Sequence, residues 1–181
     1  ENITYVGKRA FSNIEAIDDL KIEDTAAFAS AEEAFLESSV KSVIFNMTDA
    51  VPSIAIPYAM FKDCRQLKNV SFTGNTNALF KIGKSAFYNT DIKDITIPNQ
   101  TYIINDCAFA GCKNLKKIKL PDQLEYIYSN VFSHCMSLKE IDIPNGVKYI
   151  GDSCFNLCVS LEKVKWPSMI TTVPQDCFHK C

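Results

Sequence analysis

Cysteine and histidine are the residues of this sequence best suited to carry out chemistry. The chain of 181 residues contains eight cysteines but only two histidines. A cysteine can act as a nucleophile beside a base, ligate zinc or form a disulfide. Seven of the eight occupy two fixed positions of a repeated pattern: Cys64, Cys112, Cys135, Cys158 and Cys181 at one, and Cys154 and Cys177 at the other. The repeat therefore decides which chemistry is open to them.

Three interpretations of these cysteines remain open. We favour inert buried thiols, because the cysteines follow an apolar pattern and a free cysteine behaves as a small buried hydrophobe. Disulfides between neighbouring coils are the second interpretation, with Cys154–Cys177 and Cys158–Cys181 as the leading pairs. Zinc is the third, but Cys177-x-His179-x-Cys181 lacks a matched second half and the sequence has no C-x-x-C pair.

A catalytic cysteine would need a histidine as its base. His134 directly precedes Cys135, but the repeat turns one of these side chains inward and the other outward. Paired carboxylates, a phosphate-cradling glycine loop and a Ser/His/Asp arrangement are all missing from the pattern. The sequence therefore predicts a protein that is not an enzyme and that has no catalytic residues, no metal site and no cofactor.

A repeat of about 23 residues organises the whole chain. Eight phenylalanines anchor it at steps of 24, 26, 26, 22, 23, 23 and 23 residues: Phe11, Phe35, Phe61, Phe87, Phe109, Phe132, Phe155 and Phe178. Between them recurs Leu-x-x-Ile-x-Ile-Pro, as from Leu138 to Pro144. The alternating apolar residues predict a strand with one buried face, which the proline ends. One coil cannot bury its own apolar face, so the coils must stack.

The predicted fold is an α/β leucine-rich-repeat solenoid that forms one domain over residues 1–181. Coils 1–39 are divergent and coils 40–181 are regular. We expect short parallel strands on the concave face, with each phenylalanine on a tight helical turn on the other side. Ser30 and Glu33 have capping-box spacing, which predicts a helix that carries Phe35. Because the pattern reaches both ends without a polar capping coil, we expect a piece of a longer protein.

Composition narrows the classes of partner. The formal net charge is −2 and the pI is about 5.7, which argues against a nucleic acid or an anionic membrane as partner. No apolar run approaches the roughly 18–20 residues that a membrane span needs. With 47% apolar residues, the chain is long enough to bury one sizeable core.

The string Ile-Pro-x-x-Val-x-x-Ile-Gly-x-x-x-Phe-x-x-Cys is complete from Ile143 to Cys158. It resembles the BspA-like leucine-rich-repeat family, closely over residues 40–181 and loosely over 1–39. The departures are Thr90 in place of the cysteine, and Asn105 and Tyr128 in place of the glycine. The resemblance implies a surface-anchored or secreted protein of host-associated bacteria or of certain parasitic protists. It also implies an association with adhesion to host proteins or to other cells.

We therefore predict a non-catalytic adhesion module, at a cell surface or secreted, whose partner is a host or neighbouring-cell protein. The alternative is an intracellular or periplasmic scaffold with the same fold. Unbridged cysteines suit a reducing compartment, and they favour this alternative.

Insertions in two adjacent coils predict where a partner docks. From the last strand residue to the next back-side isoleucine the count is 11 at Phe45–Ile56 and 10 at Phe72–Ile82, but 7 in the regular coils (97 to 104, 120 to 127, 143 to 150, 166 to 173). Insertions map to loops on one side of a solenoid, often the binding side. The predicted protein-binding residues are Ser42, Ile44, Met47, Val51, Asn69, Ser71, Leu79 and Phe80. Alternatively, the loops only pack on each other and cover the core.

Charged pairs on the outward side of the later strands form a second candidate surface. Successive coils present a basic, an acidic and a basic pair: Lys117/Lys119, Glu140/Asp142 and Lys163/Lys165. Cross-strand pairing of opposite charges, worth about 0.2–1 kcal/mol each, explains them without a ligand. The alternative is a charged ligand-binding face.

Overall fold

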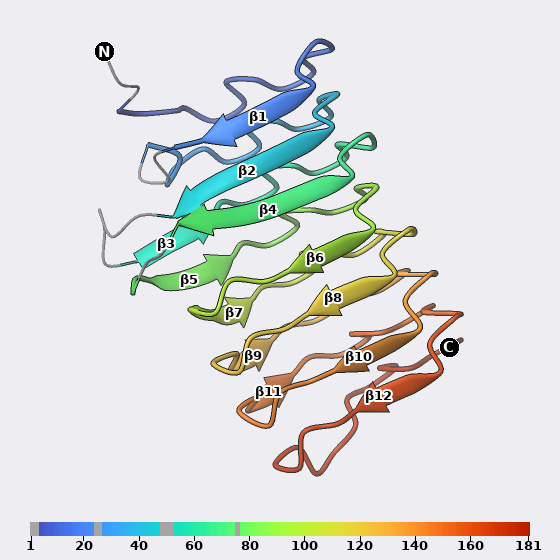
Figure 1. Cartoon of the computed structure of the whole chain (residues 1–181). Helices are drawn as coiled ribbons and strands as arrows, with labels where there is room; N and C mark the ends of the chain where they lie inside the picture. The colour runs from blue at the N-terminus through green and yellow to red at the C-terminus, as the bar shows by residue number, and fades with distance from the viewer. Residues whose placement is uncertain (1–3, 24–26, 48–52, 75–76) are drawn as a thin grey trace.

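The computed structural model describes residues 4–23, 27–47, 53–74 and 77–181 (Figure 1). These ranges contain twelve strands and no helix. The strands are β1 Asp19–Ile22, β2 Ser42–Met47, β3 Ser53–Ile56, β4 Asn69–Gly74, β5 Leu79–Ile82, β6 Asp94–Thr96, β7 Thr101–Ile104, β8 Lys117–Lys119, β9 Tyr126–Ile127, β10 Glu140–Asp142, β11 Tyr149–Ile150 and β12 Lys163–Lys165. Consequently, no described helix is long and apolar enough to cross a membrane.

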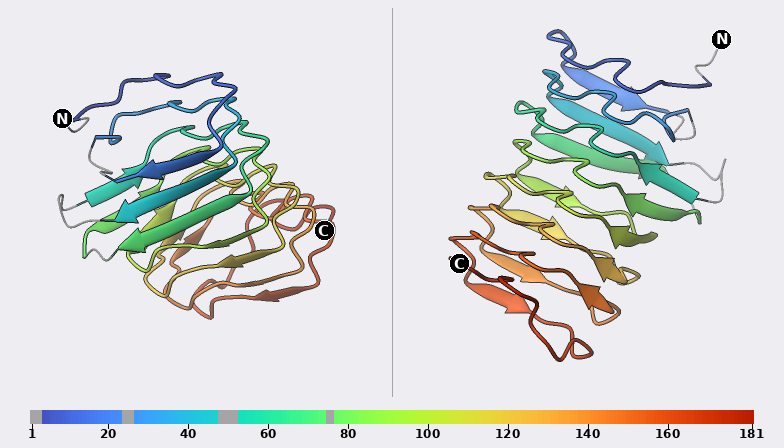
Figure 2. Two further views of the ribbon diagram at one scale, coloured as in Figure 1. Left: turned by 45° about the horizontal axis from the view of Figure 1, so that its top comes forward. Right: turned by 180° about the vertical axis from the view of Figure 1, so that it is seen from behind.

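Two parallel sheets run along the stack, because successive coils contribute strands to each. The first sheet has the order β1-β2-β4-β6-β8 and is continued by the pair β10-β12, and the second has the order β11-β9-β7-β5-β3. Figure 2 shows the second sheet from behind, with the N- and C-termini at opposite ends of the stack. Equivalent residues of successive coils pair directly, as Asp19 with Ser42 and Ser42 with Asn69. The expected stack of parallel coils is confirmed.

The phenylalanine segments are turns, so the expected helical turns are wrong. In every coil the residues two before and two after the phenylalanine have a left-handed backbone, with φ between 50° and 76°: Arg9, Asn13, Glu33, Glu37, Ala59, Asp63, Ser85, Asn89, Cys107, Gly111, Asn130, His134, Ser153, Leu157, Asp176 and Lys180. A right-handed helix cannot pass through such residues. The helix expected from Ser30 and Glu33 is wrong for this reason, because Glu33 itself has a φ of 56°.

These turns form a third row of hydrogen bonds between coils. In the first coil, the N–H groups of Arg9, Phe11 and Asn13 donate to carbonyl oxygens of the next coil, at 3.0, 2.8 and 2.9 Å. The intervening N–H groups close turns within their own coil, as Ser12 N–H does on the oxygen of Arg9 at 3.1 Å. The alternation of right- and left-handed residues thus pairs backbone groups that would otherwise be buried and unsatisfied.

The turns hold the phenylalanine rings in one internal column. Phe35, Phe61, Phe87, Phe109, Phe132 and Phe155 are buried, and each ring stacks on the next at centroid distances of 5.3–6.0 Å. Phe11 and Phe178 extend the column at its ends, at 5.2 and 5.4 Å. Offset aromatic pairs add about 0.5–1.5 kcal/mol each to the stabilisation from burial alone.

We expect Phe132→Ala to lower the free energy of unfolding by about 3–5 kcal/mol, because it opens a cavity between the rings of Phe109 and Phe155. Urea unfolding followed by circular dichroism measures the change. The control is Lys139→Ala at an exposed site directly before β10. Its free energy of unfolding should stay within about 0.5 kcal/mol of that of the parent. A loss below about 1 kcal/mol for Phe132→Ala would contradict the column.

Candidate functional site

The recurrent cysteines form a column of hydrogen-bond donors beside the phenylalanine rings. The thiol of Cys64, Cys112, Cys135, Cys158 or Cys181 donates to the carbonyl oxygen of the phenylalanine one coil earlier, at 2.9, 3.1, 3.3, 3.1 and 3.0 Å in that order. All of these except Cys181 are buried, and all eight cysteines of the chain are free thiols. Their shared position follows from this structural bond.

Ser38 and Thr90 occupy the same position, which explains why the position accepts residues other than cysteine. The hydroxyl of Ser38 donates to the oxygen of Phe11 at 2.7 Å. The hydroxyl of Thr90 donates to the oxygen of Phe87 in its own coil at 3.0 Å and lies 3.2 Å from the sulfur of Cys112. Sequence reasoning recognised Thr90 as the departure and overlooked Ser38. The common requirement is a small side chain with a donor.

The environment of these thiols opposes nucleophilic chemistry. Burial raises the pKa of Cys112 to about 11 and that of Cys158 to about 12, so the reactive thiolate is disfavoured at neutral pH. His134 is half-buried, and its Nδ1 lies 2.9 Å from the hydroxyl of Ser133, whereas Cys135 is fully buried. Nowhere in the described ranges do three or more His, Cys, Asp or Glu side chains gather in an arrangement that could hold a metal ion.

The outward residues of the first sheet form two exposed columns, as the strand pattern predicted. The charged pairs of β8, β10 and β12 are all exposed. In this fully described part of the chain, none of these six side chains forms an ion pair within 4.0 Å. They line a shallow groove of about 510 Å³. The cross-strand pairing of these charges is therefore weaker than the register alone suggests.

The predicted binding edge contains an uncharged region. Ile44, Asn69 and Ser71 lie on the outward side of β2 and β4 and are exposed, and Ile44 keeps 36% of its surface accessible. Ser42, at the start of β2, is half-buried and hydrogen-bonds the carboxylate of Asp19 through its hydroxyl. The structure thus brings four of the predicted residues together on two neighbouring strands.

The predicted loop residues are placed differently. Met47 and Phe80 are buried in the core, with 4% and 0% of their surface accessible, so the expectation that they project as contacts is wrong. Much of the predicted loops is strand, since β2 continues to Met47 and β5 begins at Leu79, and alternate strand residues face inward. Leu79 is 49% exposed. Val51 lies outside the described residues.

A groove lies beside the uncharged region, where the first sheet opens. β4 pairs with β2 at six positions but with β6 at one, Asn69 with Asp94. β6 is short because Pro98 follows it, whereas Thr73 takes the place of that proline in β4. The diverging strands enclose about 490 Å³, and the half-buried ring of Phe72 forms part of the wall. The missing Ile-Pro pair was the sequence signal for this groove.

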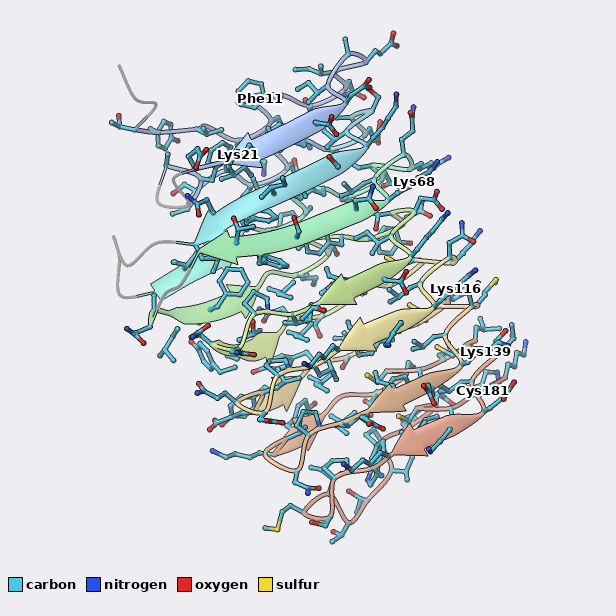
Figure 3. All side chains as sticks on the ribbon, in the orientation of Figure 1. Phe11, Lys21, Lys68, Lys116, Lys139 and Cys181 are labelled. Carbon is cyan, nitrogen blue, oxygen red and sulfur yellow. The ribbon has the colours of Figure 1, made fainter. Side chains whose placement is uncertain are left out.

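Sequence reasoning also overlooked a column of lysines at the N-terminal ends of the first-sheet strands. Lys41, Lys68, Lys93, Lys116 and Lys139 each stand directly before the first-sheet strand of their coil, and all five are exposed. The stacking is direct, because Lys68 N–H donates to the oxygen of Lys41 at 2.9 Å and Lys116 N–H donates to that of Lys93 at 2.7 Å. Figure 3 shows Lys68, Lys116 and Lys139 along one side of the sheet.

The raised pKa of Cys158 predicts a loss of stability in alkali. Burial raises the pKa of this thiol to about 12, from an ordinary value of 9.0. Folding favours the protonated form, so its contribution is complete below about pH 9 and disappears as the pH rises towards 12. Cys158→Ser keeps a donor, as Ser38 does, but removes the titrating proton.

We therefore expect the free energy of unfolding of the parent to fall relative to Cys158→Ser by up to about 1.4 kcal/mol per pH unit between pH 9 and 11. Urea unfolding at a series of pH values measures the difference, and Cys181→Ser at the exposed end of the column should show a smaller one. A constant difference between the parent and Cys158→Ser would contradict the burial of this thiol.

The chain is similar to bacterial leucine-rich-repeat proteins of known structure. A leucine-rich repeat protein from Bacteroides ovatus is 33% identical over 87% of this chain and 39% of its own, with a TM-score of 0.72. The T. pallidum leucine rich repeat protein is 25% identical over 78% of this chain and 60% of its own, with a TM-score of 0.56.

A leucine rich cell surface protein from Faecalibacterium prausnitzii shares the fold, at 21% identity and a TM-score of 0.50, over 98% of this chain and 62% of its own. The chain thus spans less than two thirds of each of these proteins. No curated protein matches the sequence. The BspA type leucine rich repeat region matches residues 1–93 and 80–181 in six copies, and the chain therefore belongs to the BspA-type leucine-rich-repeat family.

Proposed function

We propose that the chain is a non-catalytic module, secreted or held at a cell surface, that binds a protein of a host or of a neighbouring cell. Its fold is a scaffold of a kind that typically binds through an extended rigid face. The observation that carries the proposal is the uncharged region of the first sheet, where exposed Ile44 stands among Ser42, Asn69 and Ser71.

This region has the character of the centre of an interface. Charged residues are depleted at interface centres, because their water must be removed on binding. Here the outward residues of β2 and β4 are all uncharged, whereas β1 presents Asp19 and Lys21, and β8, β10 and β12 present only charged side chains. The adjoining groove with its wall of Phe72 adds apolar surface that a partner side chain can bury.

The resemblance of the chain to the BspA-like family supports the surface location and the adhesive role, since it implies both. The alternative, an intracellular or periplasmic scaffold, is favoured by the eight free thiols, which suit a reducing compartment. Proteinase treatment of intact source cells separates the two. Digestion of the protein in intact cells supports the surface location. Digestion only after the cells have been opened supports the scaffold.

The binding test measures the dissociation constants of the parent and of Ile44→Lys for a panel of purified extracellular-matrix proteins by surface plasmon resonance. We expect the parent to bind at least one of these proteins. Ile44→Lys should weaken that binding at least about tenfold, or 1.4 kcal/mol, because it places an unpaired charge at the interface centre. The Ile44 side chain faces outward, so the circular dichroism spectrum should not change.

The matched control is Lys163→Ala on β12, which alters the outward columns without touching the uncharged region. It should bind within about twofold of the parent. Weaker binding by this control together with unchanged binding by Ile44→Lys would move the site to the charged columns of β8, β10 and β12. Absence of binding by the parent would count against the adhesive function.

A further inference from the structure

The lysine column gathers positive charges on one part of a chain whose net charge is −2. Lys41, Lys68, Lys93, Lys116 and Lys139 occupy one position in five successive coils, between Asp18 in the coil before and Glu162 in the coil after. Stacked strand positions lie roughly 4.7–4.9 Å apart, so the five Cα atoms span roughly 19 Å. Overall charge cannot reveal this column, because the acidic residues of the chain offset the lysines in the sum.

The carboxylates of the structure leave the column largely uncompensated. Among the described residues, Lys41 alone of the five forms an ion pair, with Asp18 at 2.9 Å. Asp63, which precedes Lys68 in its coil, accepts a hydrogen bond from the amide of Asn89 at 2.6 Å and lies 3.7 Å from the guanidinium of Arg65. Asp91 accepts a hydrogen bond from the side chain of Asn114.

Like charges on directly opposite residues destabilise a sheet, so the column works against folding. The fold does not demand lysine at this position, since Asp18 occupies it in the coil before and Glu162 in the coil after. A run of five lysines at exposed positions is therefore unexplained by stability. It matches a ligand that carries a row of closely spaced negative charges.

We propose that the lysine column binds a linear acidic polysaccharide, whose sulfate or carboxylate groups lie along the row of ammonium groups. The single-file geometry distinguishes this ligand from other polyanions. Sites for single-stranded nucleic acid interleave aromatic stacking platforms with basic residues. The positions that directly follow the five lysines hold no aromatic residue: they are Ser42, Asn69, Asp94, Lys117 and Glu140. In an extended acidic peptide, side chains on one face recur at roughly 6.6 Å, which does not match the coil spacing.

This site is separate from the proposed protein-binding region, and it does not depend on that proposal. A polysaccharide along the lysine column would lie beside Ser42 and Asn69 and would leave Ile44 and Ser71, further along β2 and β4, free. The two surfaces can therefore be disabled independently.

The test uses heparin octasaccharide as the probe and isothermal titration calorimetry at 50–300 mM NaCl. The column variant carries Lys68→Ser and Lys116→Ser. The control variant carries Lys117→Ser and Lys163→Ser, which removes the same charge from the outward face. We expect the parent and the control to bind within about twofold of each other, and the column variant to bind at least tenfold more weakly. Its dependence on salt should also be shallower, because fewer counterions are released.

Thermal unfolding of each variant keeps the result interpretable. The column variant should unfold at the same temperature as the parent or a higher one, since it relieves repulsion. No binding of heparin by the parent, or equal losses in both variants, would overturn the proposal. Tighter binding of a single-stranded oligonucleotide or of a polyglutamate peptide of equal charge would overturn the assignment to a polysaccharide. If the column variant loses heparin binding and Ile44→Lys binds heparin as the parent does, this site is separate from the protein-binding one.

Discussion

The structure depends on one repeated requirement, that each coil must place a phenylalanine ring on the ring of the coil before it. The unbroken contacts from Phe11 to Phe178 fix the height and direction of every coil. The left-handed residues on both sides of each ring then aim alternate N–H groups at the next coil. Packing and hydrogen bonding therefore specify the same repeat, and each reinforces the other. The cysteines serve this requirement too, since their thiols complete the bonding of the phenylalanine carbonyls.

A stack specified in this way leaves its surface free to vary. Outward side chains of the first sheet contribute little to the core, so coils differ there without disturbing the fold. The uncharged region around Ile44 and the lysine column are the two departures that stability does not explain. Both lie on the same sheet, and a rigid backbone holds each in place. Recognition by such a surface loses little conformational entropy in the backbone when a partner binds.

The sequence predicted the stack well because its signals were apolar and periodic. The phenylalanine spacing gave the coil length, and the alternation of Ile141 and Ile143 gave the strands and their outward faces. It failed at the turns, because a left-handed residue such as Leu157 or Ala59 carries no side-chain signature, and glycine fills only one of these positions, at Gly111. It also failed at Met47 and Phe80, since the length of the insertion concealed the continuing strands. The lysine column escaped notice because it lies outside the apolar pattern.

We propose that this rigid stack binds a protein through β2 and β4 of its first sheet. Hydrogen–deuterium exchange of the chain, free and saturated with its protein partner, tests that claim most directly. We expect slower exchange on binding in the segments that contain β2 and β4, and in residues 94–100 beside the groove. Exchange in the phenylalanine turns, which face away from the partner in this account, should stay unchanged. Protection confined to those turns, or to the second sheet, would contradict it.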